Sequence, residues 1–224
     1  MPQLPLFSAV ILDMDGLALD TEKTYCQAWK QAAQQMGHHL SQAFCDSLSG
    51  LSYAEVESKL LDYCGAGLDL QQFRQTSTVL WRRTVQKQGI ATMPGLLELL
   101  DALTEDNLPF CLATNSQRIN ALECLQLAGL EGVFNILVTR DQVEYGKPAP
   151  DIFFTAAEQL GVSINRCLVV EDSDAGVAAA QQAGAWVILI PVNGRELSGA
   201  SLAADLILKN LAELAEMIRC KSGN

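Results

Sequence analysis

The stretch Phe7-Ser8-Ala9-Val10-Ile11-Leu12-Asp13-Met14-Asp15-Gly16 joins an apolar run to two carboxylates and a glycine. The apolar run predicts a buried strand. That strand delivers Asp13 and Asp15 to its own end, and Gly16 then lets the backbone turn away sharply. Because alternate residues of an extended chain point to opposite sides, one carboxylate can attack a substrate while the other handles protons. Taken alone, the pattern is equally typical of a strand followed by an acidic turn.

The composition of the chain favours a globular protein that binds neither nucleic acid nor membranes. Hydrophobic residues make up 49% of the 224 residues and charged residues 18%, which suits a sizeable core. The net charge of -11 argues against nucleic acid, because binding to a phosphate backbone needs a basic face. The longest apolar runs have the length of strands, and the first residues lack the pattern of a signal peptide. An anionic substrate would therefore need local cations, such as a metal ion and a lysine.

The seven cysteines are irregularly spaced and form no C-x-x-C pair. This spacing does not support a zinc site or thioredoxin-like chemistry. We expect a cytoplasmic protein, since free cysteines suit a reducing compartment. The expected assembly is a monomer, with a dimer left open.

The order of the expected elements predicts an α/β fold, a doubly wound parallel-sheet (Rossmann-like) core with an inserted all-helical cap domain. Helical patterns follow one another over residues 18–90, without a credible strand between them. Beyond residue 91, short apolar runs alternate with helices, which is typical of a parallel sheet covered on both faces. We therefore expect residues 1–17 and 91–224 to form the core and residues 18–90 to form the cap. After the first strand, the expected strands span 110–113, 136–138, 167–170 and 186–190.

Polar clusters follow four of the expected strands. The clusters consist of Asp13 and Asp15; Thr114, Asn115 and Ser116; Lys147; and Glu171 and Asp172. Since the carboxyl ends of parallel strands form one edge where ligands bind, we expect these clusters to meet in one crevice. Each cluster has an ordinary explanation by itself, as a helix cap or a solvated loop residue. Their coincidence at one sheet edge favours a functional site.

The types of residue at this edge predict a site that binds a metal ion and a phosphoryl group. Asp13, Asp15 and Asp172, with Glu171 behind them, offer oxygen ligands without histidine or cysteine, a set typical of a hard cation such as Mg²⁺. A threonine hydroxyl, a backbone N–H at a helix start and a lysine supply the donors that a phosphoryl group needs. Phosphoryl transfer depends mainly on positioning and charge neutralisation, and an aspartate can act as nucleophile through an aspartyl-phosphate.

Four motifs extend these clusters, and they occur in the order Asp13-x-Asp15-Gly16-x-x-x-Asp20-Thr21-Glu22, Ala113-Thr114-Asn115-Ser116, Gly146-Lys147-Pro148-x-Pro150 and Val170-Glu171-Asp172-Ser173-x-x-Gly176. In this order they resemble the motifs of the haloacid dehalogenase-like (HAD) phosphohydrolases with a helical cap, a subgroup that includes β-phosphoglucomutase-like and phosphoglycolate phosphatase-like proteins. The resemblance covers essentially the whole chain.

The resemblance implies a role for each site residue. Asp13 would be the nucleophile and Asp15 the general acid and then the general base. Thr114 and Asn115 would bind the phosphoryl group, and Lys147 would bridge that group and Asp13. Mg²⁺ would be held by Asp13, by Asp172 and by the carbonyl oxygen of Asp15. Glu171 would lie behind these ligands or serve as an alternative ligand.

The expected function is Mg²⁺-dependent hydrolysis of a small phosphomonoester, such as a sugar phosphate or a nucleotide-derived phosphate. The alternative is a β-phosphoglucomutase-type phosphosugar mutase. Such mutases look to carry a histidine and an arginine in the cap where this chain has Tyr25 and Tyr53, which favours simple hydrolysis. We expect Gly50, Tyr53 and Tyr25 to contribute to substrate specificity.

Two further alternatives fit the sequence less well. A dehalogenase shares the aspartate nucleophile but needs no metal, and Asp15 with the acidic pair Glu171-Asp172 argues against that reaction. A phospho-accepting signalling switch carries its acidic pair on the first strand and its phosphorylated aspartate on the third. In this chain that order is reversed, and the expected cap has no use in a switch.

Overall fold

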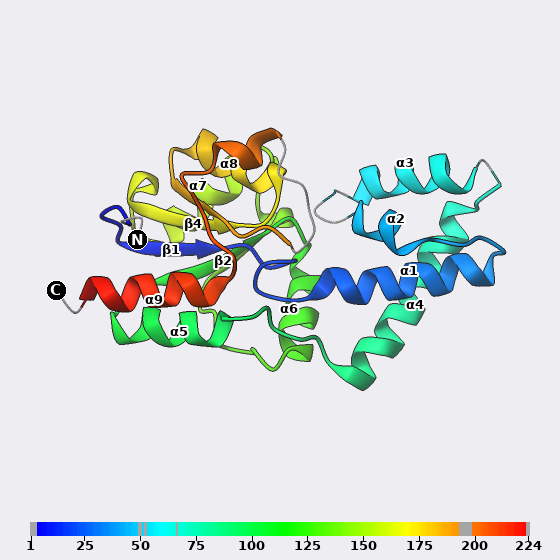
Figure 1. Cartoon of the computed structure of the whole chain (residues 1–224), viewed down its shortest axis with the longest axis horizontal. Coiled ribbons are helices and arrows are strands. Elements are labelled where there is room, and N and C mark those ends of the chain that lie inside the picture. The colour runs from blue at the N-terminus through cyan, green and yellow to red at the C-terminus, as the bar shows by residue number, and fades with distance from the viewer. Residues whose placement is uncertain (1–3, 49–50, 52, 66, 193–198, 223–224) are drawn as a thin grey trace. The chain divides into compact units, whose positions relative to one another are not determined.

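The computed structural model describes residues 4–48, 51, 53–65, 67–192 and 199–222, and the chain forms two compact units (Figure 1). The first unit comprises Met1–Leu19 and Thr92–Asn224, and the second comprises Asp20–Ala91. Leu19 belongs to the first unit because it forms isolated β-bridges with Asp15 and Thr92.

The first unit contains a six-stranded parallel sheet of order β3-β2-β1-β4-β5-β6, which confirms the predicted fold class. The strands are β1 Ala9–Leu12, β2 Phe110–Thr114, β3 Leu137–Thr139, β4 Cys167–Glu171, β5 Trp186–Leu189 and β6 Leu206–Ile207. The central strand β1 lies between β2 and β4, and Leu12 pairs with both Leu112 and Val170. The carboxyl ends of these three strands are therefore level.

Helices cover both faces of this sheet. Figure 1 shows α7 (Asp151–Leu160) and α8 (Asp174–Ala183) on one face and α5 (Leu96–Glu105) and α9 (Leu211–Ser222) on the other. The connections after β2 and β3 add α6 (Arg118–Leu127) and the short 3₁₀ helix η1 (Arg140–Gln142), and further 3₁₀ helices are η2 (Ile164–Arg166) and η3 (Gly199–Ala203).

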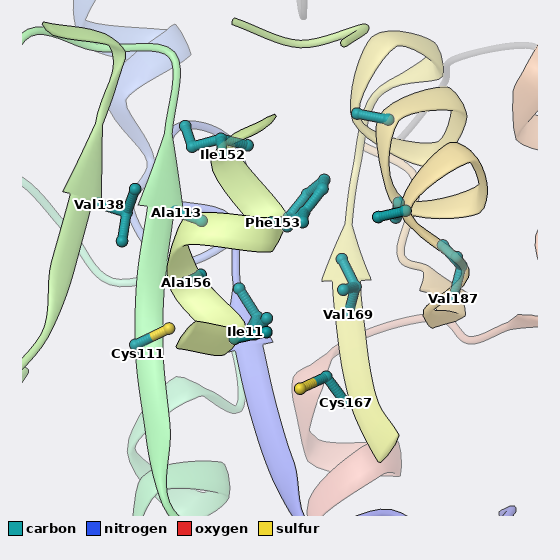
Figure 2. Close-up of a cluster of buried hydrophobic side chains, with 14 of the residues drawn as sticks. Ile11, Cys111, Ala113, Val138, Ile152, Phe153, Ala156, Cys167, Val169 and Val187 are labelled. Carbon is teal, nitrogen blue, oxygen red and sulfur yellow. The ribbon is translucent and has the colours of Figure 1, made fainter. Parts of the chain in front are cut away.

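The core on one face of the sheet lies beneath α7. Figure 2 shows Ile152, Phe153 and Ala156 of this helix packed over the sheet, with Ala156 next to Ile11 and Cys111 in this view. All five side chains are buried. Because alternate residues of a strand face opposite sides, this packing fixes which residues of β1 point to each layer, and it leaves the end of the strand for the polar residues that follow.

The described residues of the second unit form helices α1 (Thr21–Gln35), α2 (Gln42–Asp46), α3 (Tyr53–Cys64) and α4 (Leu70–Gln88). The Asp69 carboxylate caps α4 by accepting a hydrogen bond from the backbone N–H of Gln72 at 3.0 Å. The short helix α2 was not expected from the sequence, because a single turn carries too little periodicity. No helix in the described ranges is both long and apolar enough to cross a membrane.

Candidate active site

The polar clusters predicted from the sequence meet at the carboxyl edge of β1, β2 and β4, within the first unit. Asp13 directly follows β1, Thr114 ends β2, Glu171 ends β4, and Lys147 lies in the connection between η1 and α7. These residues and Asp172 are buried, with exposed fractions of 0 to 9%. Residues far apart in the sequence therefore form one buried polar cluster, as expected for this edge of a parallel sheet.

Lys147 lies at the centre of the cluster. Its ammonium donates hydrogen bonds to the Asp13 carboxylate, to Glu171 Oε1 at 2.6 Å and to the Ala113 carbonyl oxygen at 2.8 Å. An ammonium group has three protons, so these contacts use all of its donors. The bridging role implied for Lys147 would require a phosphoryl oxygen to replace one of these acceptors.

Glu171 is fully buried and holds Lys147. One of its carboxylate oxygens accepts from Lys147, and the other accepts from the Asp172 backbone N–H at 3.1 Å and the Ser173 hydroxyl at 3.0 Å. A Cβ atom on Gly176 would lie 1.9 Å from Glu171 Cδ, so the carboxylate occupies space that only a glycine leaves open. Both oxygens of Glu171 are thus bound by groups of the chain itself.

Asp15 is oriented by two hydroxyl groups. Its Oδ2 accepts hydrogen bonds from Thr114 Oγ1 at 3.0 Å and from Ser116 Oγ at 2.8 Å. Thr114 Oγ1 also accepts from the Ser116 backbone N–H at 3.0 Å. Because a hydroxyl has a single proton, Thr114 can donate to Asp15 or to a phosphoryl oxygen, but not to both at once. The sequence placed Ser116 in a motif without giving it a role.

The side chain of Asn115 is bound to the main chain of Lys147. Its Nδ2 donates to the Lys147 carbonyl oxygen at 3.1 Å, and its Oδ1 accepts from the Lys147 N–H at 2.9 Å. A Cβ atom on Gly146 would lie 2.6 Å from that Oδ1, so the connection passes close to Asn115. A contact from Asn115 to phosphate would therefore come from its backbone N–H, while its side chain positions Lys147.

The electrostatics of the cluster reflect its burial. Burial raises the pKa of Asp13 from 3.8 to about 8; the Lys147 charge opposes this shift, and Glu171 and Asp15 add to it. Burial also acts to lower the pKa of Lys147, but the charges of Asp13 and Glu171 outweigh it and hold that pKa above its usual range. Lys147 is therefore a permanent cation in a site where acidic groups are in excess.

The donor set fits a hard divalent cation. The described residues contain no group of three or more His, Cys, Asp or Glu side chains arranged to hold a metal ion. The set implied by the resemblance needs only two carboxylates, Asp13 and Asp172, because its third donor is the main-chain carbonyl oxygen of Asp15. All of these donors are oxygen atoms, which Mg²⁺ prefers, and a divalent cation would offset the excess of acidic groups.

The residues expected to contribute to specificity belong to the second unit. Tyr25 of α1 stacks on Trp29, with ring centroids 6.0 Å apart, and on Trp81 of α4, with centroids 5.1 Å apart. Gly50 lies outside the described residues, as does the side chain of Tyr53. The role of these residues in specificity stays a prediction.

Comparison with known proteins agrees with the resemblance. The family model of the haloacid dehalogenase-like hydrolases matches residues 7–184. A phosphorylated carbohydrates phosphatase of Thermotoga maritima is 32% identical over 176 residues, which cover 79% of this chain and 81% of the relative. A β-phosphoglucomutase of Bacillus subtilis is 30% identical, with 95% of this chain and 97% of the relative covered. The crystal structure of a HAD family hydrolase from Deinococcus radiodurans R1, with bound phosphate and sodium, matches at a TM-score of 0.76 and 28% identity, covering 95% of this chain and 97% of that one.

Proposed function

Because this chain belongs to the haloacid dehalogenase-like hydrolases with a helical cap, we propose that it is a Mg²⁺-dependent phosphatase that hydrolyses a small phosphomonoester through an aspartyl-phosphate. The observation that carries the proposal is the buried contact of Lys147 with Asp13, together with the Asp15 side chain that Thr114 and Ser116 orient. Membership of the family itself implies a divalent metal ion.

In the first step, a carboxylate oxygen of Asp13 attacks phosphorus, and the bond between phosphorus and the ester oxygen breaks. Asp15 donates its proton to that oxygen, so the product leaves as a neutral alcohol. Lys147 keeps a positive charge beside Asp13 throughout, which opposes the repulsion between two anions. When bound, Mg²⁺ would neutralise charge on the phosphoryl group.

In the second step, water attacks phosphorus and Asp15, now a carboxylate, takes the proton of that water. The bond between phosphorus and Asp13 breaks, inorganic phosphate leaves, and both aspartates return to their starting states. One residue can serve as acid and then as base because each step restores the protonation state that the next one needs.

The proposed substrates are sugar phosphates or nucleotide-derived phosphates. The Thermotoga maritima relative is named for phosphorylated carbohydrates, which supports the first of these classes. Tyr25 presents a neutral aromatic side chain at the position where β-phosphoglucomutases look to carry histidine, and it stacks with two tryptophans. A phosphosugar mutase must retain a bisphosphate intermediate, so a neutral group at this position favours release of phosphate.

The mutase remains the second candidate, because the Bacillus subtilis β-phosphoglucomutase matches 95% of this chain. The two candidates predict different products from the same substrate. A mutase converts β-glucose 1-phosphate to glucose 6-phosphate when β-glucose 1,6-bisphosphate is present as a primer, whereas a phosphatase releases inorganic phosphate without a primer.

The test is a panel of metabolite phosphomonoesters, with phosphate release measured in the presence of Mg²⁺. We expect release from at least one sugar or nucleotide-derived phosphate, and a loss of roughly 10³-fold or more in Asp13→Asn, as for other removed nucleophiles. Circular dichroism of the variant should match that of the wild type. Near-normal activity in the folded variant would overturn the role of Asp13, and primed formation of glucose 6-phosphate faster than phosphate release would favour the mutase.

A further inference from the structure

The short helix η1 contacts two segments that carry residues of the site, the turn after β2 and the connection to α7. The Arg140 backbone N–H donates to the Ser116 carbonyl oxygen at 3.1 Å. Asp141 Oδ1 accepts from the backbone N–H of Arg118, the first residue of α6, at 2.9 Å. The side chain of Gln117, the residue before α6, forms no capping hydrogen bond, so Asp141 caps this helix from another element. These contacts fix η1 against the turn that follows β2.

The side chain of Arg140 contacts the second segment, the turn that leads to Lys147. Its Nη1 donates to the Val143 carbonyl oxygen at 3.0 Å, and the residue is half-buried. A Cβ atom on Gly146 would lie 2.5 Å from Arg140 Cδ and 2.8 Å from Arg140 Nε. The same Cβ atom would lie 2.6 Å from Asn115 Oδ1. The residue before Lys147 is therefore packed closely against the side chains of both Arg140 and Asn115.

We propose that Arg140 is a positioning residue that holds the turn 143–146 and thereby directs the Lys147 ammonium to Asp13. The ammonium contacts three acceptors, and displacement of its main chain would move the whole side chain away from them. Asn115 fixes the main chain of Lys147, and Arg140 fixes the turn before it. A guanidinium suits this task because it stays charged and donates strongly to a carbonyl oxygen. The effect of Arg140 on catalysis rests on the proposed function, whereas its contacts do not.

The first experiment measures kcat and KM for Arg140→Met, which keeps an apolar stem and loses the donor to Val143. We expect kcat to fall about 10-fold while KM changes less than about 2-fold, because a small misplacement of Lys147 is costly in the reacting state. Arg140→Lys keeps a cationic donor and should restore part of the lost kcat. The matched control is Arg166→Met, which should leave kcat unchanged. Arg166 also donates a hydrogen bond, to Ser8 Oγ at 3.0 Å, but it lies before β4, at the opposite edge of the sheet.

Two kinetic results would overturn the positioning role of Arg140. An unchanged kcat in folded Arg140→Met, with only a lower free energy of unfolding in urea, would show that its contacts serve stability alone. A rise in KM with unchanged kcat would place Arg140 in substrate binding instead, because such a change removes binding that is equal in the ground state and the transition state.

The second experiment measures amide hydrogen exchange by NMR and does not depend on activity. The Lys147 N–H donates to Asn115 Oδ1, so its exchange rate reports how often this turn opens. We expect Arg140→Met to accelerate this exchange about 10-fold relative to that of the Val10 N–H, which donates to the Pro109 carbonyl oxygen at 3.0 Å. Equal acceleration at both amides would mean a general loss of stability and would overturn the proposal. A wild type that releases no phosphate, with the exchange result as expected, would overturn the proposed function alone.

Discussion

Ser116 donates to the same oxygen of Asp15 that Thr114 reaches, and it is the hydroxyl that remains if Thr114 turns to a phosphoryl group. We predict that Ser116→Ala lowers phosphate release from an alkyl phosphate about 10-fold, the equivalent of one hydrogen bond to a charged group. Release from p-nitrophenyl phosphate should fall less, because its leaving group needs no proton. Equal losses for both substrates would show that Ser116 does not act through Asp15.

Asn115 positions Lys147 through both ends of its amide, across 32 residues of sequence. In Asn115→Asp, the donor to the Lys147 carbonyl oxygen is lost and a carboxylate oxygen faces that carbonyl. We predict a fall in kcat of about 10-fold to 100-fold with an unchanged circular dichroism spectrum, because a small misplacement of a catalytic group is costly. The control is Asn120→Ala, at an exposed position of α6, which should leave kcat unchanged. A normal kcat in Asn115→Asp would contradict the positioning role.

At the scale of elements, the turn from β4 to α8 determines where Glu171 points. The Ser173 hydroxyl caps α8 by accepting from the Gly176 N–H at 3.1 Å, and it donates to Glu171 at 3.0 Å. One side chain therefore links the start of the helix to the carboxylate that holds Lys147. The helix and the site share this turn, so a change in its packing affects both.

Gly176→Ala tests this turn. Its new Cβ atom would lie 1.9 Å from Glu171 Cδ, and Glu171 is held by several hydrogen bonds. We predict a loss of about 1–3 kcal/mol in the free energy of unfolding, as for other overpacked sites, measured by urea denaturation. Phosphate release should fall as well. The matched control is Gly67→Ala, where nothing lies within 4 Å of the added atom, and it should change stability by less than about 0.5 kcal/mol. Equal free energies of unfolding for Gly176→Ala and Gly67→Ala would contradict the close packing of Gly176 against Glu171.

At the scale of the whole molecule, the buried carboxyl of Asp13 makes the free energy of unfolding depend on pH and on a bound metal ion. Without a bound metal ion, burial raises the pKa of this carboxyl to about 8 in the folded protein, against 3.8 as its ordinary value. The folded state binds more protons between these values, so the contribution of this carboxyl to stability falls as pH rises from about 4 to about 8. A divalent cation bound to the ionised form would lower this pKa and keep Asp13 as the carboxylate that the proposed attack requires.

We predict that Mg²⁺ raises the melting temperature more at pH 8 than at pH 6, because binding at the lower pH must displace the proton of Asp13. Thermal unfolding followed by scanning calorimetry, with and without Mg²⁺, measures this difference. Asp13→Asn should abolish it, since an amide does not titrate. An equal gain at both pH values in the wild type would contradict the prediction. EDTA should also abolish phosphate release, and added Mg²⁺ should restore it.

The sequence alone predicted the fold class, the positions of the five longer strands and the residues that follow them. Apolar periodicity is a local property, so it can be read without knowing what each element packs against. The two-residue strand β6 and the five-residue helix α2 escaped prediction because elements of that length carry almost no periodicity. Weak periodicity also explains why the bounds of β3 differ by one residue: they were expected at 136–138 and are found at Leu137–Thr139.

Only the tertiary structure decided the contacts within the site. The sequence placed Asp13, Lys147 and Glu171 at one edge of the sheet, but not that the lysine binds both acids. Nor could it show that Asn115 holds the main chain of Lys147, since a side-chain hydrogen bond depends on the spacing and direction of two segments. The types of the residues predicted phosphoryl transfer and a metal site at this acidic edge. The order of the strands, with β1 between β2 and β4, determined which of those residues meet, because level strand ends bring together side chains that the sequence keeps far apart.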